Sequence, residues 1–103
     1  MANLVVLYTK PDDTAGFDEY YLGTHAPMAS GVPGSTWTMT RMTGTPRGGE
    51  PAYYLKAEAT FADDETLQTA LRSDEMRATG RDAAQMVGRF GNEATMLLGT
   101  DYA

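Results

Sequence analysis

The residues of this chain that are most able to do chemistry lie between Phe17 and Pro27, where the sequence reads FDEYYLGTHAP. This stretch holds the only histidine of the 103 residues, His25, with Tyr21 four positions before it. Side chains four apart on a helix share a face, so Phe17, Tyr21 and His25 are predicted to form one stripe. Imidazole exchanges protons near neutral pH, and a phenol can donate a hydrogen bond to an oxygen. The stretch therefore predicts a catalytic pair, His25 and Tyr21.

Both residues of this pair also have an ordinary structural explanation. Pro27 is expected to end the helix, which places His25 at the C-terminal edge of the helix. An imidazole there can donate to a backbone carbonyl and is favoured by the helix dipole. Tyr21 can serve only to pack its ring in the core. On the residues alone, the catalytic and the structural interpretation both stay open.

Small and aromatic side chains elsewhere in the chain could line a cleft beside the pair. Ala57 and Ala59 occupy the middle of a strand that is expected to face helices, and such small side chains leave volume that a ligand could occupy or that Trp37 could fill. Aromatic residues at alternating strand positions are common in a plain core, which is the competing explanation. The residues predicted to bind a hydrophobic or aromatic substrate are Phe17, Trp37, Tyr53, Ala57 and Phe61.

Metal and phosphate sites find little support in the sequence. One histidine and no cysteine leave too few ligands for a transition-metal site. The glycines at positions 48 and 49 are not followed by the helix that a phosphate-binding loop requires. We therefore expect no metal and no cofactor.

The charge and the composition bound the possible partners and the location. Fourteen acidic against eight basic residues give a net charge of −6. Such a chain repels phosphate backbones, and its basic residues form no cluster, so nucleic acid is not an expected partner. No apolar run approaches the roughly 20 residues of a membrane-spanning helix, and the first residues lack the features of a signal peptide. Together with the absence of cysteine, this leads us to expect a cytoplasmic protein without membrane contact.

The hydrophobic pattern predicts one domain over residues 1–103, near the commonest domain size. Runs of successive or alternating apolar residues predict strands at 3–10, 35–43, 51–61 and 93–98. Helical spacing predicts helices at 15–25 and 63–90, the second of them broken by a fresh cap near Ser73. This order is that of an α+β, ferredoxin-like βαββαβ fold, a four-stranded antiparallel sheet with its helices on one face.

The face of the sheet without helices has a consequence for assembly. Residues 4–8, LVVLY, are apolar on both sides of the first strand, and residues 96–98, MLL, repeat this in the last. A second copy of the same sheet is the simplest cover, so we expect a homodimer with Lys56 and Glu58 between the sheets. The alternative is a monomer whose Thr, Lys and Glu residues make this face sufficiently polar.

Several short motifs follow one another in a characteristic order. FDEYY at 17–21 is followed by HAP at 25–27 and VPG at 32–34. The strand at 53–61 leads into an acidic, Leu/Ala-rich helix, and SDE at 73–75 precedes the last helix. In these features the chain resembles the EthD-like family of the dimeric α/β-barrel group, over nearly its whole length.

This resemblance implies a dimer with packed sheets and a cleft in each subunit, lined by His25 and an aromatic residue of the same helix. The wider group contains cofactor-free monooxygenases, polyketide cyclases, dehydratases, decarboxylases, haem-degrading enzymes and proteins without a known reaction. Two hypotheses follow. The first is a small cofactor-independent enzyme, or accessory protein of a catabolic or polyketide-type pathway, with acid/base or oxygenase-like chemistry on a hydrophobic aromatic ligand at His25. The alternative is a non-catalytic, small-molecule-binding or structural dimeric module.

Overall fold

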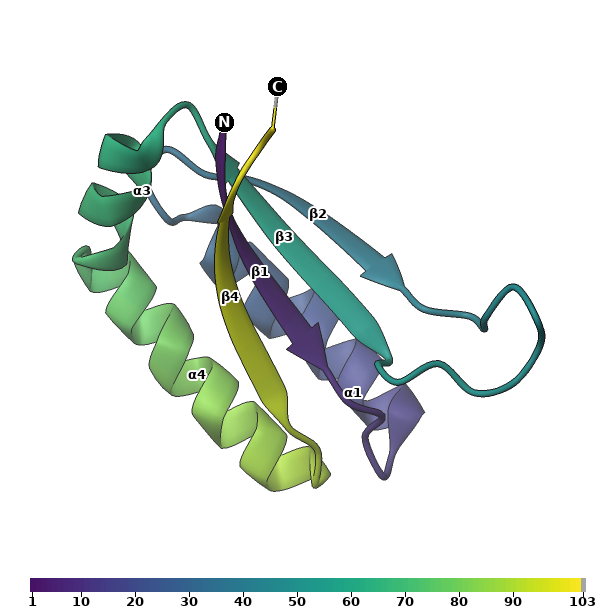
Figure 1. The fold of residues 1–103 in the computed structure, drawn as a ribbon. Coiled ribbons are helices and arrows are strands. Elements are labelled where there is room, and N and C mark those ends of the chain that lie inside the picture. Colours follow the sequence, from purple (N-terminus) through teal and green to yellow (C-terminus); the bar gives the residue numbers. More distant parts are fainter. Residues whose placement is uncertain (103) are drawn as a thin grey trace.

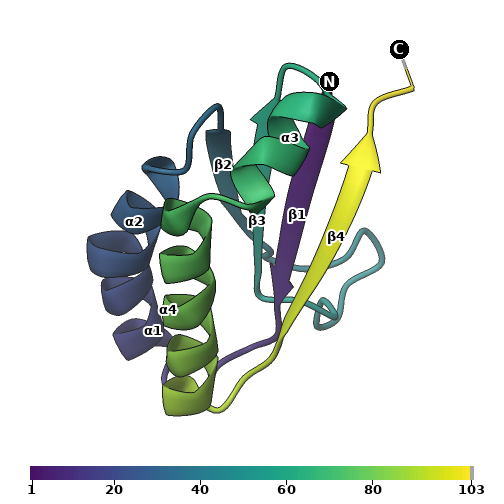
Figure 2. The same ribbon diagram turned by 90° about the vertical axis from the view of Figure 1, so that its left-hand side faces the viewer.

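The computed structural model describes residues 1–102 as a four-stranded antiparallel sheet with its helices on one face, in a ferredoxin-like arrangement (Figure 1, Figure 2). The strands lie in the spatial order β2-β3-β1-β4. In chain order the elements are β1 (Ala2–Tyr8), α1 (Thr14–Tyr20), η1 (Tyr21–His25), α2 (Ala26–Ser30), β2 (Thr36–Arg41), β3 (Leu55–Phe61), α3 (Asp64–Leu71), α4 (Asp74–Phe90) and β4 (Ala94–Thr100). The predicted order of strands and helices is confirmed.

The two central strands carry the core on their helix-facing side. In β1 and β3, alternate residues are buried because successive side chains point to opposite faces of a sheet. Ala57 lies opposite Val6, and Ala59 lies opposite Leu4. The prediction that this side of β3 faces the helices is confirmed. Leu55, Ala57, Ala59 and Phe61 are all buried.

The third strand is shorter than the sequence pattern predicts. β3 begins at Leu55, so residues 51–54 of the predicted strand belong to the long connection from β2. Pro51 has no backbone N–H to give to a ladder, which disfavours pairing at that point. Tyr54 still donates its backbone N–H to the Tyr8 carbonyl at 2.7 Å, which ties the end of the connection to β1.

The first helical region differs from the prediction in an informative way. The helix does not end at His25, because the chain continues through a π-helical segment, Tyr21–His25, into α2. Pro27 occupies the first turn of α2, where the missing N–H removes no hydrogen bond that the segment needs. The expectation that Pro27 stops the helix is therefore wrong. The π segment resets the helix, so the proline stands at a beginning and not in an interior.

The π segment also keeps one stripe of residues buried. In an α-helix, side chains four apart drift by about 40° per step, so a long i, i+4 series leaves the core. The wider turn of a π-helix, with i→i+5 hydrogen bonds, reduces this drift. Phe17, Tyr21, His25 and Ala29 accordingly all stay buried. The predicted stripe is present and extends one turn further than expected.

The second helical region is broken at Ser73, as predicted, into α3 and α4. The Asp63 carboxylate accepts from the Thr66 backbone N–H at 2.8 Å, and the Ser73 hydroxyl accepts from that of Met76 at 3.1 Å. The buried residues of α4 are Thr79, Asp82, Ala83, Met86 and Phe90, whereas Met76 and Val87 are only half-buried. The buried face of α4 therefore includes an acidic residue, Asp82.

The opposite face of the sheet carries no helix within residues 1–102 (Figure 2). On this face Val5 lies opposite Leu97 of β4 and Glu58 of β3, and Leu7 lies opposite Lys56. Leu97 remains 51% exposed. The apolar patch expected from the sequence is therefore present. Among the described residues, no helix is long and apolar enough to cross a membrane.

Candidate functional site

His25 lies inside the molecule, in hydrogen-bond contact with a buried carboxylate. Only 4% of its surface is exposed, and its Nδ1 is 2.8 Å from Oδ2 of Asp82, which is itself 9% exposed. η1 supplies the histidine and α4 the aspartate, 57 residues later. A carboxylate beside Nδ1 fixes that nitrogen as the protonated one and leaves Nε2 with a free lone pair in the neutral ring.

Asp82 is held in place from its other oxygen by Tyr20. The Tyr20 hydroxyl donates to Oδ1 of Asp82 at 2.5 Å, and this hydrogen bond to the carboxylate raises the pKa of the phenol. The Arg89 guanidinium lies over the Tyr20 ring, 5.6 Å from its centroid. Each oxygen of the buried carboxylate thus has a partner, which satisfies the requirement that a buried charge be hydrogen-bonded.

A cavity of about 30 Å³ lies between the sheet and α4, against His25. This volume has room for about one water molecule. The lining is mostly apolar and comes from β1, β2, β3, β4, η1 and α4. The lining residues are Leu4, Val6, Tyr8, Tyr21, His25, Trp37, Ala57, Met76, Thr79, Gly80, Ala83 and Met96.

Two phenols border this cavity without a hydrogen-bond partner. Tyr8 and Tyr21 are each 2% exposed, and neither hydroxyl is hydrogen-bonded to another group within residues 1–102. Neither hydroxyl is fully enclosed, because the fully buried side-chain atom there that lacks a partner is Asn92 Oδ1. Burial raises the pKa of Tyr21 to about 12. Burial also raises the pKa of Tyr8, with smaller contributions from Tyr21 and Asp82. Both phenols therefore keep their protons at neutral pH and can act as donors.

An aromatic cluster behind the cavity holds these rings in position. The Phe17 ring stacks on that of Tyr21 at a centroid distance of 5.7 Å and meets that of Tyr8 edge-on at 5.8 Å. Tyr21 in turn lies 5.3 Å from the His25 ring. Edge-on and offset-stacked pairs of this kind are favourable beyond the area they bury. The orientation of His25 is thus supported by packing as well as by Asp82.

The structure brings together some of the residues predicted for the site. His25, Tyr21, Trp37 and Ala57 all line the cavity. Phe17 lies in the aromatic cluster behind it, outside the lining. Phe61 is buried at the far end of β3, opposite Ala2.

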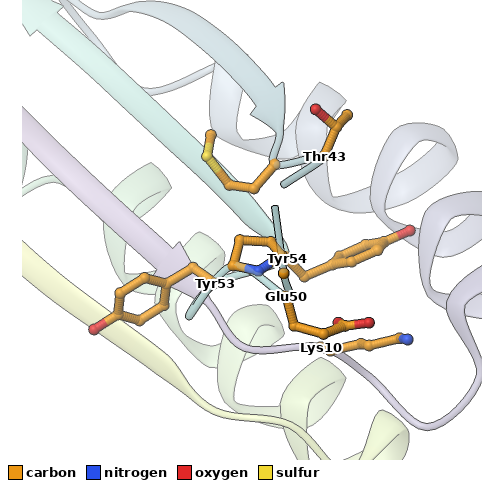
Figure 3. A pocket seen from close by; sticks show the side chains of 8 residues that line it. Lys10, Thr43, Glu50, Tyr53 and Tyr54 are labelled. Atoms are coloured by element: carbon orange, nitrogen blue, oxygen red, sulfur yellow. The ribbon is translucent and has the colours of Figure 1, made fainter. Parts of the chain in front are cut away.

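Tyr53 lies elsewhere, in an open hollow of about 190 Å³ at the connection between β2 and β3. Lys10, Glu50 and Tyr54 border the same hollow, and the rings of Tyr53 and Tyr54 extend in opposite directions (Figure 3). The Tyr54 hydroxyl donates to the Asp18 carboxylate at 2.9 Å.

Two residues of the site escaped the reasoning from the sequence, Asp82 and Tyr8. Asp82 is three residues after Thr79 and four before Met86, so it shares the buried face of α4. An acid within an apolar helical stripe was the available signal. Tyr8 alternates with Leu4 and Val6 on the helix-facing side of β1, and nothing local distinguishes it from a core tyrosine. Within residues 1–102, no group of three His, Asp or Glu side chains could hold a metal ion.

The fold and the buried imidazole–carboxylate pair between sheet and helices define the class of protein, a ferredoxin-like α+β protein with an internal polar site. Residues 11–89 match the family model described as the EthD domain. A solved EthD (ethyl tert-butyl ether D) family protein of Bacillus halodurans C-125 is 39% identical, with 98% of each chain covered and a TM-score of 0.88. The chain belongs to the EthD family.

More distant structures share the fold alone. SnoaB of Streptomyces nogalater, described as a cofactor-independent oxygenase, is 16% identical, with 99% of this chain and 93% of that chain covered and a TM-score of 0.65. A protein of Thermobifida fusca YX, described as a dimeric ferredoxin-like protein of unknown function, is 12% identical. That likeness covers 93% of this chain and 88% of the other, with a TM-score of 0.61.

Proposed function

We propose that this protein is a cofactor-independent acid–base enzyme that acts on a small hydrophobic, aromatic molecule in the cavity at His25. The observation that carries the proposal is the buried contact of 2.8 Å between His25 Nδ1 and Asp82 Oδ2 beside a cavity. A histidine whose Nδ1–H donates to a carboxylate is held in one tautomer and one orientation, with Nε2 left free to accept a proton. The expected catalytic residues are His25 as the proton-transferring group and Tyr21 as a donor.

The reaction that suits these groups is proton removal next to a carbonyl, or from a phenol. Nε2 of His25 takes the proton, and the electron pair of the broken C–H bond moves onto the carbonyl oxygen as an enolate. The Tyr21 hydroxyl, protonated at neutral pH, donates to that oxygen and stabilises the negative charge. Return of the proton to a carbon or to an oxygen restores His25.

The same first step would serve an oxygenase, because an enolate or phenolate is electron-rich enough to react with molecular oxygen without a cofactor. The resemblance in fold to SnoaB is compatible with this continuation. Trp37, Ala57 and Phe17 support the proposed binding of an aromatic ligand, the first two as lining and the third as packing behind Tyr21. Tyr53 and Phe61, predicted as ligand contacts, lie outside this cavity.

Proton exchange in D₂O tests the proposal without knowledge of the natural substrate. 2-Tetralone, an uncharged bicyclic ketone with acidic C–H bonds, is incubated with the protein, and the loss of its α-proton signals is followed by NMR. The His25→Asn variant keeps an amide donor for Asp82 but removes the titratable Nε2. We expect it to lower the protein-catalysed exchange about 10²- to 10⁴-fold with an unchanged melting temperature. Equal exchange by both proteins, or none above buffer with wild type, would contradict the proposal.

The small cavity favours one alternative, a non-catalytic binding or structural module. A volume of about 30 Å³ is far below that of an aromatic molecule, so surrounding side chains must move before one can bind. In this alternative, wild type would not accelerate exchange, and His25→Asn would change only the melting temperature.

We further propose that the protein is a homodimer in which the open sheet faces pack together. The exposed Leu97, with Val5 opposite it on β1, supports this assembly, because burying such an apolar patch under a second sheet stabilises the dimer. Lys56 and Glu58 stand on the same face and are placed to pair between the sheets. Light scattering at micromolar concentration should give twice the mass of one chain, and Leu97→Glu should give a single-chain mass. A wild-type monomer would contradict the proposal.

A further inference from the structure

Gly80, in the middle of α4, has no evident structural reason to be a glycine. Glycine in a helix interior is less favourable than alanine by about 1 kcal/mol. Its backbone does not have a positive φ. A Cβ atom placed at Gly80 would meet no heavy atom within 4 Å outside its own turn of the helix. The glycine nevertheless lines the cavity at His25, whereas Gly88, the other glycine of α4 with open space at its Cβ position, does not.

The surroundings of Gly80 at the cavity are apolar and adaptable. Met76 lies one helical turn before it, and Met96 comes from β4, where its side chain is 54% exposed. Methionine is unbranched and has three rotatable bonds, so it can move aside with little strain. None of the residues that line the cavity carries a carboxylate, an ammonium or a guanidinium group. A charged ligand would find no counter-charge on this path.

Hydrogen-bonding groups at the inner end of the cavity are free to bind an oxygen atom of a ligand. The hydroxyls of Tyr8 and Tyr21 have no hydrogen-bond partner within residues 1–102, and neither is fully enclosed, so each keeps space in which a ligand oxygen could bond to it. Nε2 of His25 is the ring nitrogen that Asp82 leaves free. A ligand hydroxyl placed among them could accept from the two phenols and donate to Nε2, and a ligand carbonyl could accept from the two phenols.

We propose that the ligand enters through a notch at Gly80, between Met76 and Met96, and that it is an uncharged, flat, apolar molecule with one carbonyl or hydroxyl oxygen. The methionine side chains turn outward, the apolar part of the ligand takes the space that a side chain at position 80 would fill, and its oxygen reaches Tyr8 and Tyr21. This inference rests on the proposed function and adds to it the ligand class and the path of entry.

Binding of 2-naphthol at pH 7 tests the notch, with the signals of His25 and Trp37 as reporters. The chain has one histidine and one tryptophan, and both line the cavity, so their NMR signals are unambiguous. We expect 2-naphthol to shift both signals in the wild-type protein. Gly80→Leu should raise the Kd at least tenfold, and the charged analogue 2-naphthoate should bind at least tenfold more weakly than 2-naphthol.

Gly88→Leu is the matched control. Gly88 lies on the same helix, is exposed, and also has open space where a Cβ would stand, but it does not line the cavity. This variant should bind 2-naphthol as wild type does. If Gly80→Leu does not fold, Gly80→Ala takes its place. We expect this variant to have a higher melting temperature than wild type and a Kd for 2-naphthol several-fold above that of wild type.

Each of three results would overturn the inference. They are no shift of either signal in wild type, an unchanged Kd in the Gly80 variants, and equal or tighter binding of 2-naphthoate. Failure of the proposed catalysis would look different, because 2-naphthol would bind through the notch while 2-tetralone showed no exchange above buffer.

Discussion

The cavity at His25 and the hollow beside Lys10 differ in size, exposure and chemistry. The hollow has about 190 Å³ and opens to solvent at the β2–β3 connection, between Lys10, Glu50 and Tyr53. The cavity has about 30 Å³, and its lining includes two buried phenols and the buried imidazole of His25, which contacts the Asp82 carboxylate behind it. The smaller cavity is therefore the better candidate for a functional site, although the hollow is larger.

Polar groups removed from water are a stronger reason than volume for proposing a site. Lys10 and Glu50 are exposed, so water can solvate their charges and nothing about them requires a ligand. In the cavity, burial removes water from the phenols and from the His25–Asp82 pair, and electrostatic interactions there are stronger than at the surface. The following predictions would sharpen or break this contrast, from the largest expected effect to the smallest.

Asp82→Asn should lower the 2-tetralone exchange rate about 10- to 100-fold, because the amide no longer fixes the Nδ1–H form of the imidazole. The ¹⁵N chemical shifts of the His25 ring should show a mixture of the two neutral tautomers in the variant and one in wild type. An unchanged exchange rate together with a single tautomer would show that the carboxylate does not position His25.

The free energy of unfolding should fall as the pH rises from about 10 to 12. The pKa of Tyr21 is raised to about 12 in the folded protein, whereas an unfolded tyrosine loses its proton near pH 10. Between these values the unfolded state binds fewer protons, so stability decreases, by about 2–3 kcal/mol in total for this group. Urea denaturation at several pH values measures the slope.

Tyr21→Phe is the variant that isolates this contribution. It should reduce the loss of stability above pH 10, although burial of Tyr8 contributes a further loss in the same direction. Tyr53→Phe, at the open hollow, is the control and should leave the slope as in wild type. Identical slopes for Tyr21→Phe and wild type would show that the phenol is not buried in solution.

Tyr20→Phe should lower the free energy of unfolding by about 0.5–1.5 kcal/mol, the contribution of an ordinary hydrogen bond, since Asp82 keeps His25 as its other partner. A second readout separates positioning from plain stability. The ¹⁵N chemical shifts of the His25 ring at pH 7 should change when Asp82 loses this donor, because the carboxylate can then move relative to the imidazole. A change in stability without any change in these ¹⁵N shifts would make Tyr20 purely structural.

Tyr53→Ala should change neither the exchange rate of 2-tetralone nor the binding of 2-naphthol. Tyr53 is half-exposed, and it lines the open hollow but not the cavity at His25. Measuring 2-tetralone exchange and 2-naphthol binding for Tyr53→Ala and for His25→Asn compares the hollow with the cavity directly. A loss similar to that of His25→Asn would mean that the open hollow belongs to the site.

Much of the fold was predictable from local patterns. The alternation of Leu55, Ala57, Ala59 and Phe61 identifies the buried side of a strand, because side chains of a strand alternate between faces. The capping residues before α3 and α4 mark where each helix begins. The continuation of the helix past Pro27 was not predictable, because a π-helical turn depends on hydrogen bonds that no residue pattern reveals.

The sequence by itself determined the ferredoxin-like order of elements and the placing of Tyr21 and His25 on one buried stripe. These depend on spacing along the chain, which helical and strand periodicity converts directly into faces. Only the tertiary structure decided that Asp82, 57 residues away, is the partner of the imidazole. Only the tertiary structure shows that Tyr53 lies outside the cavity and that Tyr8 lines it. Such contacts arise from the packing of α4 against the sheet, and packing across the core is not encoded in the spacing of either segment.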